Sequence, residues 1–168
     1  LPEKEPGRVF NHRFNIHLDP STIIRNEVIY PVRGAVRYAV EENNRVRTFY
    51  TILAHVPENM DEISAQVLGE IMYQSHYGYT ECGLGCQETD LLVSLVRSEE
   101  NNGLLGAKVT GGGAGGTVAV LGWNTPSAHQ AFQRTIQRYQ KQTGIDPYIF
   151  KGSSAGCDSF GISMYSPT

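Results

Sequence analysis

The stretch KVTGGGAGGTVAVLGW, residues 108–123, holds five glycines in the six positions from 111 to 116, where only Ala114 carries a side chain. The flanking runs LLGAKVT and TVAVLGW are short and rich in β-branched residues, which predicts two strands joined by the glycines. Each glycine costs roughly 0.5–1 kcal/mol in ordered structure, and a tight turn needs only about two of them. A ligand or another backbone is therefore expected to come very close to this loop.

Helices are predicted on the N-terminal side of these strands. Apolar residues recur at helical spacing over residues 31–53, where Pro31 suits the first turn, and again from Asp61, a predicted N-cap, to about His76 or beyond. A third helix is predicted within residues 83–96, after which SEENNG forms a polar turn.

The C-terminal side repeats the two kinds of element. A helix is predicted over residues 125–143, because Thr125 can cap it, Pro126 occupies its first position and Gly144 ends it. Two more strands are predicted, PYIFK at 147–151 and FGISMY at 160–165. Strands that follow one another with few crossover helices favour antiparallel pairing, so the expected fold class is α+β, an antiparallel sheet covered by helices.

Composition narrows the class of function. Hydrophobic residues make up 40% of the 168 and charged residues 18%, an ordinary globular balance. The net charge of −3 argues against a general nucleic-acid binder, and no apolar run suggests a membrane span or a signal peptide. Three cysteines without CxxC spacing suit a reducing compartment, so a cytoplasmic location is expected; for Cys82 and Cys86, small apolar thiols are favoured over a zinc site.

The opening residues differ in texture from the remainder. LPEKEPGRVF is polar, contains two prolines and has no initiator methionine, and little periodicity appears before about residue 27. We expect residues 1–27 to be a linker or irregular lead-in from a missing N-terminal half, and residues 28–168 to form one domain.

Three interpretations compete for the glycine run. Gly111, Gly113 and Gly116 satisfy the dinucleotide-binding pattern GxGxxG, but a strand follows instead of a helix and no acidic residue occurs between Glu100 and Asp146. A Walker A loop fails as well, because a threonine stands where the lysine is required. The remaining choice lies between a phosphate-proximal loop, whose consecutive N–H groups bind an anion, and a loop shaped by packing alone; the first is favoured.

Several stretches of the sequence together resemble a known family. GAKVTGGGAGGTVAVL resembles the third conserved motif of the GHMP small-molecule kinases, which include the galactokinases, homoserine kinases and mevalonate kinases. VIYPVRGAVRYAV and LGEIMYQSHYGYTECGLGCQETDLLVSLV resemble galactokinase segments, and the ending YIFKGSSAGCDSFG is most similar to the plant-type L-arabinokinases, as is the opening LPEKEP with HLDPST. The resemblance covers nearly the whole chain and implies the fold of a GHMP kinase C-terminal domain.

The resemblance also implies site residues. The loop would lie near the ATP phosphates and bind nucleotide through Thr110, Gly111, Gly112, Gly113, Ala114, Gly115 and Gly116. Tyr30 matches the tyrosine that contacts the sugar. His76, Glu88 and Asp90 match patterned positions without an implied catalytic role, and helix-end packing and capping are favoured for them.

What the resemblance does not find here is equally informative. The nucleotide loop, the catalytic aspartate and its basic partner belong to the family's N-terminal half, and GSSAG at 152–156 lies between two predicted strands and is expected to be a turn. ATP and Mg would be held mainly by that N-terminal domain, a partner of this one, so no catalytic or metal-binding residue is assigned here. The resemblance implies a kinase acting on the anomeric hydroxyl of L-arabinose or galactose and inactive as this fragment, or alternatively a non-catalytic sugar- and nucleotide-sensing module.

Overall fold

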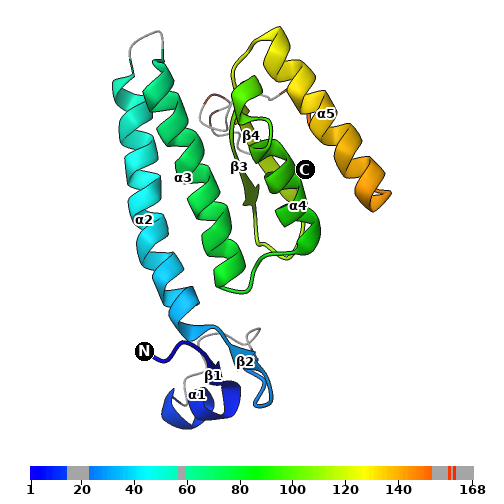
Figure 1. The fold of residues 1–168 in the computed structure, drawn as a ribbon. Helices are drawn as coiled ribbons and strands as arrows, with labels where there is room; N and C mark the ends of the chain where they lie inside the picture. Colours follow the sequence, from blue (N-terminus) through cyan, green and yellow to red (C-terminus); the bar gives the residue numbers. More distant parts are fainter. Residues whose placement is uncertain (15–22, 57–59, 153–158, 160, 162–168) are drawn as a thin grey trace, which may run out of the picture.

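The computed structural model describes residues 1–14, 23–56, 60–152, 159 and 161, and its elements follow one another as Figure 1 shows. In chain order they are β1 (Glu5–Pro6), α1 (Gly7–Phe14), β2 (Ile29–Tyr30), α2 (Val32–His55), α3 (Glu62–Glu81), α4 (Gln87–Arg97), the short 3-10 helix η1 (Glu100–Asn102), β3 (Leu104–Thr110), β4 (Thr117–Gly122) and α5 (Pro126–Thr143). Strand β1 pairs with β2 and β3 with β4, both antiparallel. The expected α+β class with antiparallel strands and covering helices is confirmed.

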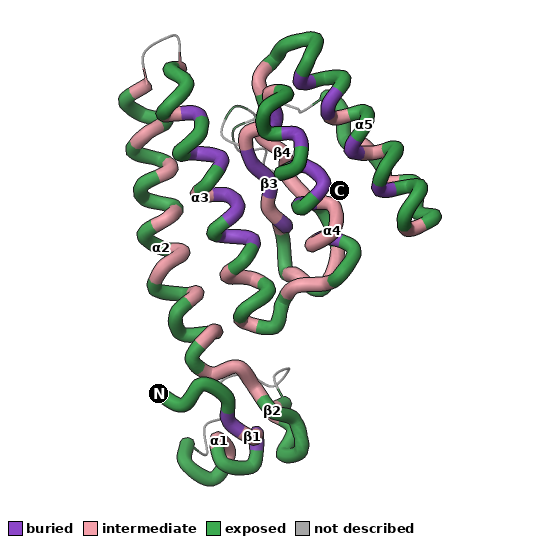
Figure 2. The backbone as a smooth tube through the Cα atoms, in the orientation of Figure 1, coloured by how far each residue is buried: buried purple, intermediate pink, exposed green. Residues whose placement is uncertain are grey.

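The core lies where α3, α4 and α5 meet the β3–β4 hairpin. Figure 2 shows the buried residues as purple segments on those elements, while α2 shows none. The cluster of buried side chains comprises Tyr73, Val93, Val96, Leu104, Ala107, Ala128 and Ala131. Trp123 and Phe132 pack against its rim. The amphipathic spacing of the helices thus buries one stripe of each against the hairpin.

Helix α3 approaches β3 so closely that glycine is required on both sides. A Cβ placed on Gly69 would collide with the carbonyl oxygen of Leu105, and one placed on Gly106 would lie 2.5 Å from the Cα of Gly69. Since backbone atoms cannot move aside as a flexible side chain can, both positions must lack a side chain. The pair fixes the height of α3 along β3.

Helix α2 packs on α3, on the side away from the hairpin (Figure 1). Its Glu42 carboxylate accepts hydrogen bonds from the Ser75 hydroxyl at 2.6 Å and from Lys108 Nζ at 3.2 Å. Although burial raises the pKa of Glu42, hydrogen bonds from Ser75 and Arg45 outweigh it and the pKa is lowered. One ion-paired carboxylate therefore links α2, α3 and β3.

Local capping signals are confirmed. The Asp61 side chain accepts a hydrogen bond from the Ser64 N–H at 2.9 Å, and the Thr125 hydroxyl accepts one from the Ala128 N–H at 3.3 Å. Gly144 ends α5 in the left-handed conformation, with φ 72°. These ends were readable because each depends on residues within one turn.

Two expectations differ from the structure. Residues 147–151 form no strand, and Tyr148 and Phe150 are 80% and 74% exposed and stack edge-to-face on each other at 4.9 Å. An alternating pattern gives a strand only where a sheet edge receives it, and among the described residues none pairs with this segment. The other predicted C-terminal strand, 160–165, lies outside the described residues except for Gly161.

The lead-in was expected to be irregular and contains a helix instead. Phe10 and Phe14, four residues apart on α1, stack at 4.8 Å, and Arg13 pairs with Glu5 at 2.9 Å. The N–H of Gly7 donates to the Val28 carbonyl, so α1 is tied to the chain just before β2. Across the described residues, no helix has the length and apolar character needed to cross a bilayer.

Candidate functional site: the glycine loop and the end of helix α3

The glycine loop, residues 111–116, connects β3 to β4 mostly through left-handed backbone. The φ angles are 79° at Gly111, 81° at Gly113, 114° at Gly115 and 100° at Gly116, and Ala114 is also positive at 56°. Side chains disfavour this region by about 1–2 kcal/mol. The shape of the turn therefore accounts for four of the five glycines, where the sequence indicated only about two of them for the turn.

Gly112 is the exception. Its φ lies outside the left-handed region, and a Cβ added there would meet no described atom within 4 Å. Neither backbone strain nor packing within the described residues requires a glycine at this position. The described part of the chain thus leaves open space beside Gly112.

The inner side of the loop is fastened to α3 and to the segment that follows it. The Tyr79 hydroxyl donates to the Gly111 carbonyl at 2.7 Å, and the Ala114 N–H donates to the Leu84 carbonyl at 2.6 Å. A Cβ on Gly113 would lie 2.6 Å from the same Leu84 oxygen. Sequence reasoning missed Tyr79 and Leu84; the available signal was that Tyr79 follows His76 by three residues, on the same face of the helix.

Most main-chain N–H groups of the loop have no acceptor among the described residues. Of the N–H groups in the loop, only that of Ala114 has an acceptor among the described residues. The N–H groups of Gly111, Gly112 and Gly113 are consecutive and without an acceptor there. Consecutive main-chain N–H groups of this kind form an anion-binding concavity, so the loop has the donors that a phosphate group needs.

His76 connects α3, α4 and β3 just before the loop. Its Nδ1 accepts a hydrogen bond from the Val109 N–H at 3.3 Å, and its Nε2 lies 3.1 Å from an Asp90 carboxylate oxygen. Burial lowers the pKa of His76, and this effect together with the nearby Lys108 ammonium outweighs the opposite effect of Asp90. Glu88 lies exposed in the first turn of α4, where its negative charge interacts favourably with the positive end of the helix dipole. The contacts of His76 and Asp90 agree with the packing interpretation, whereas no side chain of the described residues caps the start of α4 by a hydrogen bond.

Tyr30 lies at the end of β2 and directly before α2. Its hydroxyl accepts a hydrogen bond from the Arg25 N–H at 3.0 Å. Its neighbour Pro31 lies close to Gly83, because a Cβ added to Gly83 would be 3.4 Å from the proline ring. The residues around Tyr30 and the glycine loop thus both abut the connection between α3 and α4, at Gly83 and Leu84.

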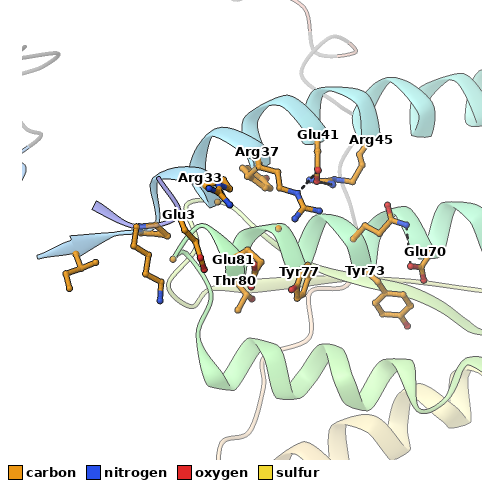
Figure 3. A pocket seen from close by; sticks show the side chains of 18 of the residues that line it. Glu3, Arg33, Arg37, Glu41, Arg45, Glu70, Tyr73, Tyr77, Thr80 and Glu81 are labelled. Carbon is orange, nitrogen blue, oxygen red and sulfur yellow. Dashed lines mark hydrogen bonds and ion pairs between the residues drawn. The ribbon is translucent and has the colours of Figure 1, made fainter. Parts of the chain in front are cut away.

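A groove of about 1060 Å³ is lined by side chains of α2 and α3 (Figure 3), and Pro31 and Gly83 are also among its lining residues. Arginines and glutamates line it in compensating pairs. Arg37 and Glu41 approach to 2.6 Å, and Arg97 and Glu70 to 2.9 Å. The sequence did not reveal this groove, because it depends on where α3 packs against α2.

The described residues offer little to a metal ion. No group of three or more histidine, cysteine, aspartate or glutamate side chains gathers within them. Cys82 and Cys86 are free thiols, and the Cys82 thiol donates to the Tyr79 carbonyl at 3.2 Å.

Comparisons with known proteins point to one family. The family model described as "GHMP kinases C terminal" matches residues 58–141, half of the chain. L-arabinokinase of Arabidopsis thaliana is 40% identical over 168 residues, which is 96% of this chain and 16% of that protein. Galactokinase of Thermotoga maritima is 33% identical over 120 residues, or 68% of this chain and 30% of the relative.

A solved structure of L. major mevalonate kinase in complex with R-mevalonate aligns at 22% identity with a TM-score of 0.40, over 64% of this chain and 33% of that one. That similarity is too low to support a conclusion. The chain spans less than a third of the two curated relatives named above. On the match of the family model and the two sequence relatives, the chain belongs to the GHMP kinases and carries their C-terminal region.

Proposed function

We propose that this chain is the C-terminal part of an ATP-dependent sugar kinase that phosphorylates the anomeric hydroxyl of L-arabinose or, second, of galactose. The observation that carries the proposal is the glycine loop. Three consecutive N–H groups at 111–113 have no acceptor among the described residues, and neither φ nor packing there requires a glycine at 112. The similarity to an L-arabinokinase and to galactokinases supports the sugar and the reaction.

The role of the loop follows from the chemistry of phosphoryl transfer. Charge spreads over the oxygens of the transferred phosphoryl group, and catalysis consists mostly of positioning and of electrostatic stabilisation. Main-chain N–H groups at 111–113 can donate to those oxygens only if no side chain covers them. A glycine at 112 keeps the approach open.

The remaining parts of the reaction come from elsewhere. We infer that an N-terminal half supplies the nucleotide pocket, the base that accepts the sugar proton and most of the contacts to Mg-ATP. Tyr30 contributes to the wall of the sugar site, near the connection that also holds the loop. Because the nucleotide pocket and the base would come from that other half, we infer that this chain alone is inactive.

The test is a kinase assay on the parent protein, produced with its upstream region, across a panel of aldoses with Mg-ATP. L-arabinose is expected to give the highest kcat/KM, with galactose next. The 168-residue chain alone serves as the matched control and should show no turnover. A parent that binds sugar and nucleotide but phosphorylates no aldose would replace this function with the sensing module.

A further inference from the structure

Three contacts join α3 and the segment after it to β3 and the glycine loop, and they follow the same order along both parts of the chain. His76 meets Val109, Tyr79 meets Gly111 and Leu84 meets Ala114. The second and third hold the loop itself, as described above. The first holds the strand two residues before the loop begins, and the proposed function does not account for it.

The partners of His76 determine its tautomer. Nδ1 faces an N–H donor, so it must carry the lone pair. The proton of the neutral ring is then on Nε2, which donates to the Asp90 carboxylate. Asp90 is itself held by the Thr80 hydroxyl at 3.2 Å. The carboxylate thus selects the tautomer that can accept from β3.

This arrangement does more than fill space. His76 is 7% exposed, and its Nδ1 satisfies a main-chain N–H that an apolar side chain of equal size would leave unpaired. The contact falls at the point where β3 gives way to the left-handed backbone of the loop. A shift of β3 there would be passed directly to the free N–H groups at 111–113.

We propose that Asp90 and His76 are positioning residues for the glycine loop: Asp90 fixes the tautomer of His76, and His76 fixes the end of β3, so that the free N–H groups are held in the orientation that a phosphate requires. The proposal rests on the proposed function for the identity of the ligand. The contacts that join Asp90, His76 and the Val109 N–H, here called the clamp, are a property of this chain and can be tested without the ligand.

Protonation opens the clamp. A proton on Nδ1 would place two donors against each other, the ring N–H and the Val109 N–H, and the hydrogen bond would be lost. The charged groups that face the ring are the Asp90 carboxylate from α4, which favours protonation, and the Lys108 ammonium from β3, which opposes it. Lys108 is paired with Glu42 of α2. The loop is therefore held in place above the pKa of His76 and loosened below it.

The first experiment uses this chain alone. Nitrogen NMR of the wild-type ring reports the tautomer, which should be Nε2-protonated, and amide exchange gives protection factors for Val109 and residues 111–113. His76→Asn retains an acceptor for Val109 and does not titrate, whereas His76→Gln reaches Asp90 and leaves the Val109 N–H without an acceptor. Protection of Val109 should fall about tenfold in His76→Gln at pH 7.5 and stay within about twofold in His76→Asn.

Wild-type protection should also fall as the ring titrates, while that of His76→Asn should not. The α5 amides, remote from the clamp, report whether each variant is folded. An Nδ1-protonated tautomer in the wild type would overturn the proposal without any variant. Equal protection of Val109 in the two variants, with α5 intact, would overturn it as well.

The second experiment uses the parent kinase. His76→Gln should raise KM for ATP about tenfold and leave KM for the sugar within about twofold, and His76→Asn should restore KM for ATP. If the wild-type parent phosphorylates no aldose, the proposed function fails while the tautomer and exchange results stand. If the parent is active and His76→Gln leaves KM for ATP unchanged, the positioning role fails alone.

Discussion

Replacing Gly113 with alanine should cost this protein about 2–3 kcal/mol of stability. The left-handed backbone at 81° disfavours a side chain by about 1–2 kcal/mol. The new methyl group would also lie 2.6 Å from the Leu84 carbonyl oxygen and 2.7 Å from the Leu84 Cβ, so the loop must withdraw. Withdrawal breaks the hydrogen bond from the Ala114 N–H to that carbonyl, a loss of about 1 kcal/mol.

The matched control is one residue away. Gly112→Ala meets no described atom within 4 Å and needs no unusual φ, so its stability should be unchanged or up to about 1 kcal/mol higher. Urea unfolding can be followed by the fluorescence of Trp123, the single tryptophan of the chain. Tm should fall by about 4–12 °C for Gly113→Ala alone. Equal free energies of unfolding for the two variants would refute the assignment of Gly113 to packing against Leu84.

Three further predictions concern the frame around the loop. Gly69→Ala should lower the free energy of unfolding by about 2 kcal/mol, because the added methyl group collides with the Leu105 carbonyl. This collision outweighs the roughly 1 kcal/mol by which alanine favours a helix over glycine. An unchanged urea midpoint would contradict the close approach of α3 to β3. Thr125→Ala should cost about 1 kcal/mol and expose the first-turn amides of α5 to exchange, while Thr125→Ser should not. The hydrogen bond from Arg134 lowers the pKa of Glu99, so the ionised carboxylate stabilises the fold above its ordinary pKa of 4.5, and this stabilisation is lost as pH falls through the folded pKa. Glu99→Gln should therefore remove that part of the pH dependence of the free energy of unfolding between pH 7 and pH 3. An identical pH profile in the variant would count against this role of Glu99.

Local signals in the sequence predicted the elements that depend on near neighbours. The β3–β4 hairpin was visible because glycines separate two runs of β-branched residues, and the ends of α5 because Thr125, Pro126 and Gly144 act within one turn. Antiparallel pairing followed from the adjacency of the strands.

Features that depend on distant partners were not predictable in the same way. The aromatic pair Tyr148 and Phe150 has the alternation of a strand, but no sheet edge among the described residues receives it. The Gly7 N–H at the start of α1 donates to the Val28 carbonyl, and no local pattern in the sequence predicts this contact. In each case the outcome depends on an edge or surface supplied by another part of the chain.

In the candidate site, too, features set by local sequence were predictable and features set by distant partners were not. The sequence located the loop and the pattern containing His76 and Asp90. It could not tell which glycines serve the left-handed turn and which leave room, since that depends on φ and on Leu84. Nor could it show that His76 accepts from the Val109 N–H, because 33 residues separate the two.

The measurement that tests the central claim most directly is a structure of the parent protein with a non-hydrolysable ATP analogue and Mg²⁺. We predict phosphate oxygens within hydrogen-bonding distance of N–H groups at residues 111–113, above the open position of Gly112. A triphosphate bound well away from residues 110–116 would contradict the claim that this loop exists to receive it.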